Sequence, residues 1–303
     1  MQDNLFNIEG KVIVITGGCG VLGTSMSHYL ARQGARVVIL DRDSEKGEAL
    51  AQAINDELKA INDELKPTTV NAKTPSGEIK PTAVNAPQKT GDALYLPSDV
   101  LDAPTLERNR EEILSLRGRV DVLVNAAGGN MPGATIPPEK TIFDLQIDAF
   151  KKVVDLNLFG TVLPTITFAR AMVAGGSGNI INIASESSLR PLTRVAGYGA
   201  AKAAVANFTK YMAGELALKF GERFRVNAMA PGFFITEQNR TLLTNPDGTH
   251  TDRARTILAH TPYNRFGEPD ELLGTLHYLV SDASRFVSGA ILVIDGGFDA
   301  FSI

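Results

Sequence analysis

The stretch Lys11-Val-Ile-Val-Ile-Thr-Gly-Gly-Cys-Gly-Val-Leu-Gly23 joins a short β-branched apolar run to a turn rich in glycine. The apolar run, residues 11–16, is typical of a strand buried on both faces, as in a parallel sheet. Residues 22–33 then have a helical pattern, which Gly34 is suited to cap. Arg36-Val-Val-Ile-Leu40 repeats the strand pattern. Together these segments predict a βαβ unit of about 30 residues.

The same alternation continues to the end of the chain. Further strands are predicted at residues 93–96, 120–124, 179–183, 225–229 and 291–294. Helical patterns lie between them, notably at residues 143–158, 197–220 and 270–279. Alternating strands and helices indicate an α/β protein with a Rossmann-type, doubly wound and mostly parallel sheet. Length alone would suggest about two domains, but this fold can accommodate residues 1–303 as a single domain.

One segment does not fit this alternation. Residues 53–59, AINDELK, are repeated without change at residues 60–66. The apolar positions of the two copies form one helical stripe, which consists of Ile54, Leu58, Ile61 and Leu65. Apolar residues spaced in this way favour a helix. We therefore predict that the helix after the second strand extends from about Ser44 to Lys66.

A looser repeat follows, with KPTTVNA at residues 66–72 and KPTAVNA at residues 80–86. Its content of Pro, Thr and Lys predicts a surface loop or ribbon. We interpret residues 53–90 as a peripheral insertion that carries no chemistry. A role in subunit contact is the alternative.

Composition argues against several classes of protein. Hydrophobic residues make up 44% and charged residues 21% of the chain, as in ordinary folded proteins. A formal net charge of −4 argues against a general nucleic-acid binder. The chain has no run of about 18 apolar residues that would predict a membrane span, and its start lacks the pattern of a secretory signal. The single cysteine, Cys19, excludes an internal disulfide and a cysteine-based zinc site, so we expect a cytoplasmic protein without a metal.

The glycine-rich turn is suited to a dinucleotide. Gly18, Gly20 and Gly23 satisfy the pattern G-x-G-x-x-G between a predicted strand and a predicted helix. Glycines allow a sharp turn close to a pyrophosphate, and the N–H groups at the helix start favour the anion. Asp41, at the end of the second strand, can accept hydrogen bonds from ribose hydroxyls and would repel a 2′-phosphate, which favours NAD over NADP. Arg42 could soften this preference; a turn without a ligand and a solvated Asp41 are the alternatives.

A second constellation is suited to proton transfer. Tyr198 and Lys202 are one turn apart on one face of a predicted helix. A phenol is a poor base at neutral pH, with a reference pKa of about 10, but a nearby ammonium favours the phenolate. The pair could thus exchange a proton with an alcohol or a carbonyl. Ser185 follows a predicted buried strand, at the edge where doubly wound sheets bind ligands; a surface Tyr–Lys pair is the alternative.

In these motifs and their order, the chain resembles the short-chain dehydrogenase/reductase family. The matching segments are Thr16–Gly23, Asp99-Val100, Asn125-Ala-Ala-Gly128, Asn157-Leu-Phe-Gly-Thr161, Ser185, Tyr198-x-x-x-Lys202, Pro231-Gly232 and Asp295-Gly-Gly297. The resemblance covers residues 8–52 and 90–303 and leaves out only the insertion. One departure is Val21, where the family pattern T-G-x-x-x-G-x-G has glycine.

The resemblance implies an NAD(P)-dependent oxidoreductase that acts on CH–OH groups and assembles as a homotetramer. The implied catalytic residues are Asn157, Ser185, Tyr198 and Lys202. Tyr198 would be the general acid/base, and Lys202 would lower its pKa and hold the nicotinamide ribose. Ser185 would hydrogen-bond the substrate oxygen, and Asn157 would support a water relay to Lys202. The implied cofactor-binding residues are Thr16, Gly17, Gly18, Gly20, Val21, Leu22, Gly23, Asp41, Arg42, Asp99, Val100, Asn125, Ala126, Gly128, Tyr198, Lys202, Pro231, Gly232 and Thr236.

Several stretches resemble a narrower branch of the family, the D-mannonate oxidoreductases (fructuronate reductases). They are residues 16–23, 125–132, 190–194, 245–249, 260–262 and 296–301. The departure at Val21 is shared with that branch. The implied reaction is the reversible oxidation of D-mannonate to D-fructuronate with NAD. A gluconate-type or 3-oxoacyl reductase is the alternative enzyme, and an NAD-binding regulatory protein is the non-enzymatic alternative.

Three residues are candidates for contact with the substrate. A sugar acid carries a carboxylate, which an arginine fork can hold in a bidentate way. Arg190 and Arg194 lie in the loop before Tyr198, so we expect at least one of them to hold that carboxylate; a solvent-facing loop or a subunit salt bridge is the alternative. Asn130 is a candidate for the sugar hydroxyls. Residues 233–265 are expected to form a mobile substrate lid.

Overall fold

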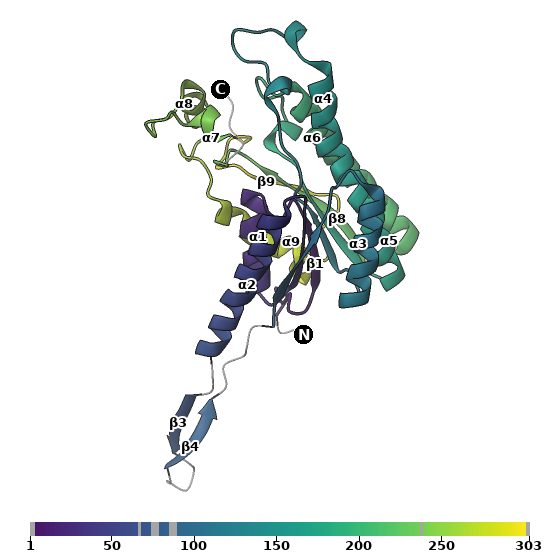
Figure 1. Ribbon diagram of the computed structural model, residues 1–303, viewed down its shortest axis with the longest axis vertical. Coiled ribbons are helices and arrows are strands. Elements are labelled where there is room, and N and C mark those ends of the chain that lie inside the picture. The colour runs from purple at the N-terminus through teal and green to yellow at the C-terminus, as the bar shows by residue number, and fades with distance from the viewer. Residues whose placement is uncertain (1–3, 66–67, 74–78, 85–89, 237–238, 301–303) are drawn as a thin grey trace.

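The computed structural model describes residues 4–65, 68–73, 79–84, 90–236 and 239–300. Within these ranges, one parallel sheet has the strand order β5-β2-β1-β6-β7-β8-β9 (Figure 1). Its strands are β1 (Val12–Thr16), β2 (Arg36–Asp41), β5 (Asp92–Pro97), β6 (Val122–Asn125), β7 (Gly178–Ile183), β8 (Phe224–Pro231) and β9 (Ile291–Ile294). The strand order reverses between β1 and β6, where sheets of this kind bind their ligands. The predicted Rossmann-type fold in a single domain is confirmed.

Helices cover both faces of the sheet (Figure 1). They are α1 (Val21–Arg32), α2 (Ser44–Glu64), α3 (Ala103–Arg117), α4 (Ile147–Val154), α5 (Gly160–Gly175), α6 (Ala196–Phe220), α7 (Arg240–Leu243), α8 (Asp252–His260) and α9 (Leu273–Val280). Shorter helical turns are η1 (Pro132–Ala134), η2 (Ile142–Asp144), η3 (Asp155–Phe159, a π-helical turn), η4 (Glu186–Ser188), η5 (Pro269–Leu272) and η6 (Asp282–Ser284). α1, α2 and α9 pack on one face, and α3, α5 and α6 pack on the other.

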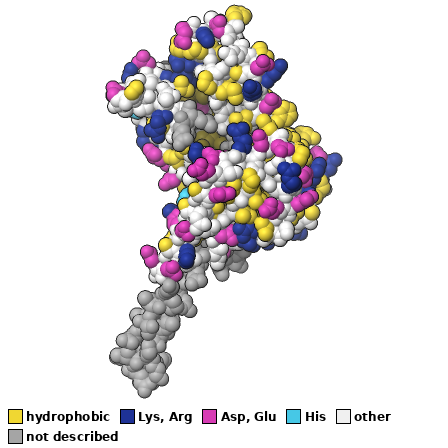
Figure 2. Space-filling model, viewed as in Figure 1, with side chains coloured by type: hydrophobic (Ala, Val, Ile, Leu, Met, Phe, Trp, Pro, Cys, Tyr) yellow, Lys and Arg dark blue, Asp and Glu magenta, His cyan; other side chains and the backbone are white. Residues whose placement is uncertain are grey.

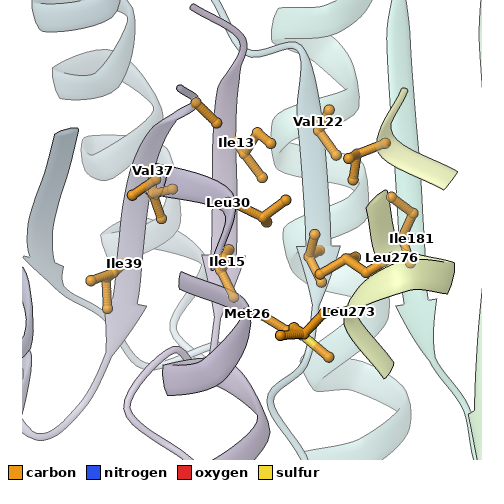
Figure 3. Close-up of a cluster of buried hydrophobic side chains, with 14 of the residues drawn as sticks. Ile13, Ile15, Met26, Leu30, Val37, Ile39, Val122, Ile181, Leu273 and Leu276 are labelled. Carbon is orange, nitrogen blue, oxygen red and sulfur yellow. The ribbon is translucent and has the colours of Figure 1, made fainter. Parts of the chain in front are cut away.

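Successive side chains of β1 enter opposite halves of the core. Ile13 and Ile15 pack in the cluster that includes Met26 of α1 and side chains of α9 (Figure 3). Val12 and Val14 belong to the second cluster, with side chains of α3 and α5. Because neighbouring side chains of a strand point to opposite faces, an unbroken apolar run is what a strand covered on both sides requires. The prediction of a doubly buried strand is confirmed.

The helix predicted at residues 143–158 has the wrong bounds. Helical structure runs from Ile147 to Gly175, through α4, η3 and α5, and only the short turn η2 precedes it. α5 buries residues on several of its sides, so its sequence has no amphipathic period that would mark where the helix ends. By length and composition alone, this is the one described helical stretch that could cross a membrane. Half of its most apolar window is buried inside the protein, as in a core helix.

The two identical copies of AINDELK lie in different surroundings. α2 ends at Glu64, close to the predicted end. In the first copy, Ile54 and Leu58 are 1% and 3% exposed within the core. In the second copy, Ile61 is only partly buried, because this part of α2 extends past the sheet (Figure 1). The same seven residues therefore contribute to the core in one copy only.

Beyond α2, the chain forms the predicted ribbon. β3 (Thr68–Lys73) pairs antiparallel with β4 (Ile79–Val84), and Val70 is opposite Thr82. In Figure 1 the ribbon lies past the end of α2, away from the large sheet. The remaining parts of the predicted insertion, residues 66–67, 74–78 and 85–89, lie outside the described residues.

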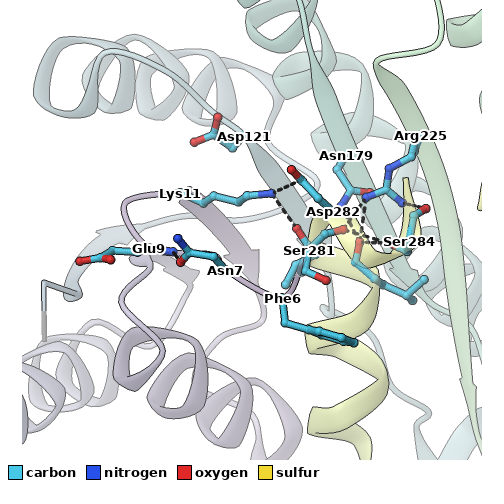
Figure 4. Close-up of polar contacts among 12 residues, drawn as sticks. Phe6, Asn7, Glu9, Lys11, Asp121, Asn179, Arg225, Ser281, Asp282 and Ser284 are labelled. Carbon is cyan, nitrogen blue, oxygen red and sulfur yellow. Dashed lines mark hydrogen bonds and ion pairs between the residues drawn. The ribbon is translucent and has the colours of Figure 1, made fainter. Parts of the chain in front are cut away.

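At the amino ends of the strands, polar contacts fasten the C-terminal region to the sheet (Figure 4). Arg225 of β8 is 9% exposed and donates hydrogen bonds to four carbonyl oxygens within residues 279–287. Asn179 of β7 donates to one of the same carbonyls, and Lys11 forms an ion pair of 3.0 Å with Asp282. These contacts satisfy the Leu279 carbonyl at the end of α9 and carbonyl groups in the segment that follows it. The opposite edge, at the carboxyl ends of the strands, is left for a ligand.

The duplicated heptads allow a matched test of core packing. We expect Ile54→Ala to lower the free energy of unfolding by about 2–5 kcal/mol, because it leaves a cavity in the core. Ile61→Ala should cost less than about 1 kcal/mol, because that side chain is only partly buried. Urea unfolding of the two variants measures both values. Equal losses would show that the second copy is packed as tightly as the first.

Candidate active site

The glycine-rich turn leaves the carboxyl end of β1 and requires glycine at two positions. Gly17 has a left-handed φ of +66°, and a Cβ on it would lie 2.6 Å from the Cα of Ala127. A Cβ on Gly23 would lie 2.3 Å from the carbonyl oxygen of Gly17. The turn therefore packs directly on the segment after β6, and its bare backbone can approach an anion at the start of α1.

The departure from the family pattern at Val21 is accommodated by the start of α1. Gly20 is the N-cap residue, and Val21 is the first residue of the helix. A Cβ on Gly20 would lie 3.4 Å from the carbonyl oxygen of Gly17, so glycine is less strictly required there than at Gly23. The structure brings together the predicted turn residues Thr16, Gly17, Gly18, Gly20, Val21, Leu22 and Gly23.

Asp41 joins the end of β2 to this turn. One carboxylate oxygen accepts the Cys19 N–H at 3.0 Å, and the other accepts the Asp43 N–H at 3.2 Å. The carboxylate is thereby held beside the glycine turn, and Arg42 next to it is exposed. Burial, followed by the charge of Asp41, raises the pKa of the Cys19 thiol to about 12. Cys19 is therefore a protonated loop residue rather than a reactive thiolate.

The end of β5 forms the next wall of this region. The Ser98 N–H donates to the Asp41 carbonyl at 2.8 Å, and the side chain of Val100 is 6% exposed. Asp99 accepts the Leu101 N–H at 2.9 Å, which holds its carboxylate in the loop. The buried Ser98 hydroxyl has no hydrogen-bond partner among the described residues. The sequence analysis missed Ser98, because a serine between a strand and an Asp-Val pair carries no signal of its own.

Taken together, these residues fit a dinucleotide. Side chains at Gly17 and Gly23 would fill this turn, and α1, a helix of twelve residues, begins within it at Val21. Asp41 provides carboxylate oxygens at the end of the second strand. Ser98, whose N–H donates to the Asp41 carbonyl, has a buried hydroxyl without a partner among the described residues. The glycine turn suits the phosphates of a dinucleotide, the Asp41 carboxylate suits ribose hydroxyls, and the segment with Ser98 suits the edge of a base.

The side chain of Asn125, at the end of β6, lies in a buried hydrogen-bond network. Its side chain is 1% exposed, and its amide donates to Thr165 and Asn182, each at 2.9 Å. Asn182 in turn donates to Thr209 at 2.9 Å. This buried network connects β6, α5, β7 and α6 beneath the site. The side chain of Asn125 thus supports the strands, and contact of Asn125, Ala126 and Gly128 with a cofactor stays a prediction.

Asn157 holds the loop after β6 in place. It lies in the π-helical turn η3, is fully buried, and exchanges two hydrogen bonds with the backbone of Gly129, at 2.7 and 3.1 Å. A Cβ on Gly128 would lie 2.7 Å from the Asn157 Oδ1 and 3.2 Å from the Lys202 Nζ. Gly128, Asn157 and Lys202 therefore meet at one point. π-helical turns often occur at functional sites, and this one places Asn157 beside Gly128, which also lies next to the predicted catalytic lysine.

Ser185, Tyr198 and Lys202 are brought together at the end of β7. Ser185 caps η4, and its hydroxyl is hydrogen-bonded to the Tyr198 phenol. Lys202 lies one turn further along α6 and is 3% exposed. Its Nζ donates to the Ile183 carbonyl at 2.7 Å and lies 5.7 Å from the centre of the Tyr198 ring. The three predicted side chains are thus grouped as the spacing of the sequence implied.

The electrostatics of this group differ from the sequence-based expectation. Burial raises the pKa of Tyr198, and the hydrogen bond from Ser185 acts in the opposite direction. Burial also lowers the pKa of Lys202 to about 8. The lysine does not pull the phenol pKa down here, because its ammonium is directed to the Ile183 carbonyl rather than to the phenol oxygen. The predicted depression of the Tyr198 pKa is therefore absent from this geometry.

Arg190 is committed to a contact within the chain. Its guanidinium donates to the Asp299 carboxylate at 2.6 and 2.9 Å, and it lies 3.2 Å from Glu186. Asp299 is fixed in turn, because its N–H donates to Asp295 at 2.6 Å. Arg190 thus connects the loop between Ser185 and Tyr198, here called the catalytic loop, to the C-terminal segment. The sequence did not reveal this link between distant residues.

The remaining candidates lie around the same edge. A Cβ on Gly232 would lie 2.6 Å from the Cβ of Asp295, so Pro231-Gly232 passes close to the C-terminal segment. The Thr236 N–H donates to the side chain of Asn239 at 2.7 Å. Asn130 donates to Thr135 at 3.0 Å, and its buried Oδ1 has no hydrogen-bond partner among the described residues. That free acceptor fits a hydroxyl donor.

Glu186 follows Ser185 and is 1% exposed. Burial and the charges of Asp299 and Asp295 raise its pKa to about 7, against the effect of Arg190. The folded protein therefore binds this proton more tightly than the unfolded chain does. The stability that Glu186 contributes is complete below its ordinary pKa and is lost as the pH rises through about 7.

We expect Glu186→Gln, whose amide resembles the protonated carboxyl, to remove this pH dependence. Between pH 5 and pH 8, the wild-type protein should lose up to about 3 kcal/mol of stability relative to the variant. Unfolding midpoints in urea at several pH values measure the difference, and Glu139→Gln, at an exposed position, is the control. A constant difference between wild type and Glu186→Gln across this range would contradict the assignment.

Among the residues that the structure describes, no group of three or more His, Cys, Asp or Glu side chains is placed to hold a metal ion.

Comparison with known families gives two matches. Residues 68–299 match the family described as enoyl-(acyl carrier protein) reductase, and residues 11–77 match the family described as short chain dehydrogenase.

Similar proteins and structures cover nearly the whole chain. The uncharacterized oxidoreductase UxuB of Bacillus subtilis is 40% identical over an alignment of 306 positions, which covers 98% of this chain and 97% of that protein. A structure from Haemophilus influenzae, provisionally assigned as a D-mannonate oxidoreductase with bound NAD, has a TM-score of 0.81 and 36% identity, covering 98% of this chain and 97% of that one. A gluconate 5-dehydrogenase from Burkholderia cenocepacia, in complex with NADP and tartrate, has a TM-score of 0.78 and 30% identity, covering 98% of both chains.

These matches agree with the arrangement of the site. One family match spans well over half of the chain, and the relative at 40% identity spans almost all of it. The glycine cradle and the group of Ser185, Tyr198 and Lys202 lie at one edge of one sheet, as the motifs predicted. The chain belongs to the short-chain dehydrogenase/reductase family and is an oxidoreductase that acts on CH–OH groups.

Proposed function

We propose that this protein transfers a hydride between NAD(H) and a secondary alcohol or ketone of a sugar acid, with D-mannonate and D-fructuronate as the substrate pair. The observation that carries the proposal is the grouping of Ser185, Tyr198 and Lys202 beside a glycine turn that fits a dinucleotide. The Asp41 carboxylate beside that turn supports NAD over NADP, because it would repel a 2′-phosphate.

The chain's own residues would orient the alcohol and move its proton. Tyr198, as the phenolate, would accept the proton of the alcohol during oxidation, and the phenol so formed would return it during reduction. The Ser185 hydroxyl holds the substrate oxygen and stabilises the charge that develops on it. Lys202, whose pKa is about 8, keeps most of its positive charge at neutral pH and holds the nicotinamide ribose. A bound NAD supplies the hydride acceptor.

The sugar-acid class is supported by the relatives and by one side chain. The structurally similar proteins include one provisionally assigned to D-mannonate and a gluconate 5-dehydrogenase with tartrate bound. The unpartnered Oδ1 of Asn130 supports a substrate with several hydroxyls. A 3-oxoacyl reductase remains the second candidate, because relatives with that activity are 29–31% identical to this chain. An NAD-binding regulatory protein would have no need for the assembled catalytic group.

NADH formation across a panel of hexonates tests the proposal. We expect D-mannonate to give the highest kcat/KM, above D-gluconate and above a 3-hydroxyacyl thioester. Tyr198→Phe should lower kcat by about 100-fold or more, because the proton acceptor is lost.

The same variant should still bind NAD, since the glycine turn and Asp41 are intact, and calorimetry measures this. Oxidation of the thioester alone would favour the 3-oxoacyl activity. Full activity of Tyr198→Phe would remove the tyrosine from the mechanism, and NAD binding without turnover of any substrate would favour the regulatory role.

We also propose that the protein is a cytoplasmic homotetramer. Exposed apolar side chains on α4, η3, α5 and α6 support an interface there, and those over α4 can be seen in Figure 2. They are Ile147, Phe159, Ile166, Tyr211 and Leu218. An exposed apolar surface of this kind commonly marks a contact between proteins.

Light scattering coupled to gel filtration should give a mass about four times that of the 32.4 kDa chain. Leu218→Glu should lower that mass, because a charge in an apolar interface opposes association. A monomer mass for the wild-type protein would be incompatible with the proposed assembly.

A further inference from the structure

Two arginines from separate segments lie close together near the catalytic loop. Arg253, in the first turn of α8, donates to the hydroxyl of Thr193 at 3.1 Å and to its carbonyl oxygen at 3.2 Å. Thr193 lies five residues before Tyr198, so α8 rests on the loop that carries the catalytic tyrosine. Arg194 is the next residue in that loop. Figure 2 shows a hollow between the part of the molecule with α7 and α8 and the part with α4, and Lys or Arg side chains lie on both sides of it.

The backbone holds Arg194 in an uncommon conformation. Its φ of +74° is left-handed, which is costly for a residue with a side chain. Its carbonyl oxygen accepts the Ile136 N–H at 2.9 Å, which ties this loop to the segment that also contains Asn130. The strained residue is thus fixed between the segments that follow β6 and β7. Strain of this kind commonly marks a functional position.

The charge of the two arginines is not balanced within the described part of the chain. Neither side chain forms an ion pair there, and Arg194 makes no side-chain hydrogen bond. Other arginines nearby are paired: Arg190 with Asp299, and Arg255 with Asp252.

Both unpaired arginines are partly buried. Burial, followed by the positive charge of Arg194, lowers the pKa of Arg253. Two like charges in partly desolvated surroundings are unfavourable until an anion lies between them.

We propose that Arg194 and Arg253 together hold the carboxylate of the substrate. The proposal rests on the proposed function and identifies the residues that select a sugar acid over a neutral polyol. A guanidinium matches a carboxylate in a bidentate way, and the loop of Arg194 leads directly to Tyr198. Arg190, the other arginine of the loop, is excluded from this role because Asp299 and Glu186 already surround it.

The test compares an anionic substrate with a neutral one. KM and kcat are measured for D-mannonate and for D-mannitol, which lacks the carboxylate, in wild type, Arg194→Gln, Arg253→Gln and Arg253→Lys. The control is Arg255→Gln, on the same helix but paired with Asp252. Each Gln variant should raise KM for D-mannonate about tenfold or more, with kcat changed less than about threefold. Values for D-mannitol should stay within about twofold, and Arg253→Lys should lie between wild type and Arg253→Gln.

Binding provides a readout independent of turnover. Calorimetry of the NADH-loaded protein with D-mannonate, D-gluconate and tartrate should show binding that each Gln variant weakens by the same factor as it raises KM. Arg194→Gln removes no hydrogen bond or ion pair that holds α8, because the Arg194 side chain makes none among the described residues. Suppose that the protein oxidises D-mannonate but that KM and Kd are unchanged in Arg194→Gln. The proposed role of the two arginines would then be wrong, and the proposed function would stand. If D-mannonate is not oxidised but the acids bind and the variants lose that binding, the arginines hold a carboxylate and the substrate assignment is wrong. If no acid binds, the proposed role of the arginines is wrong.

Discussion

A buried ammonium governs the geometry of the catalytic edge. Lys202 is 3% exposed, and its hydrogen bond of 2.7 Å to the Ile183 carbonyl joins α6 to the last residue of β7. A charge removed from water needs such partners, so this contact determines where α6 can lie on the sheet. Tyr198, one turn earlier, is placed beside Ser185 as a consequence. The same ammonium limits its neighbours, because a Cβ at Gly128 would lie 3.2 Å away from it.

Local chemistry explains why much of the molecule could be predicted. The strands are short apolar runs that need cover on both faces, and every strand predicted for the large sheet is found within a few residues of its expected position. The glycine turn has steric requirements at Gly17 and Gly23 that hold in any fold of this topology. Tyr198 and Lys202 share a helix face because of their spacing alone. Each of these inferences depends on residues close together in the sequence.

The features that the sequence could not reveal depend on contacts between distant residues or on how deeply a side chain is buried. The bounds of the helix around residues 147–175 were missed because α5 is buried on several sides and has no amphipathic period. Burial, which no local pattern reports, reverses the expected direction of the Tyr198 pKa. The two copies of AINDELK make the point most directly. Ile54 is in the core and Ile61 is at its margin, although their neighbours in the sequence are identical.

The two arginines of the loop before Tyr198 show how such distant contacts can give neighbouring residues of the same type different roles. Arg190 and Arg194 are four residues apart and were equivalent candidates in the sequence. Asp299, which is 109 residues beyond Arg190, accepts a hydrogen bond from the Arg190 guanidinium. Arg190 therefore connects the loop to the C-terminal segment. Arg194 receives no such partner in the described chain and instead meets a second positive charge from α8. Because a balanced arginine holds structure while an unbalanced one attracts an anion, the placement of one aspartate decides which of the two can meet a substrate.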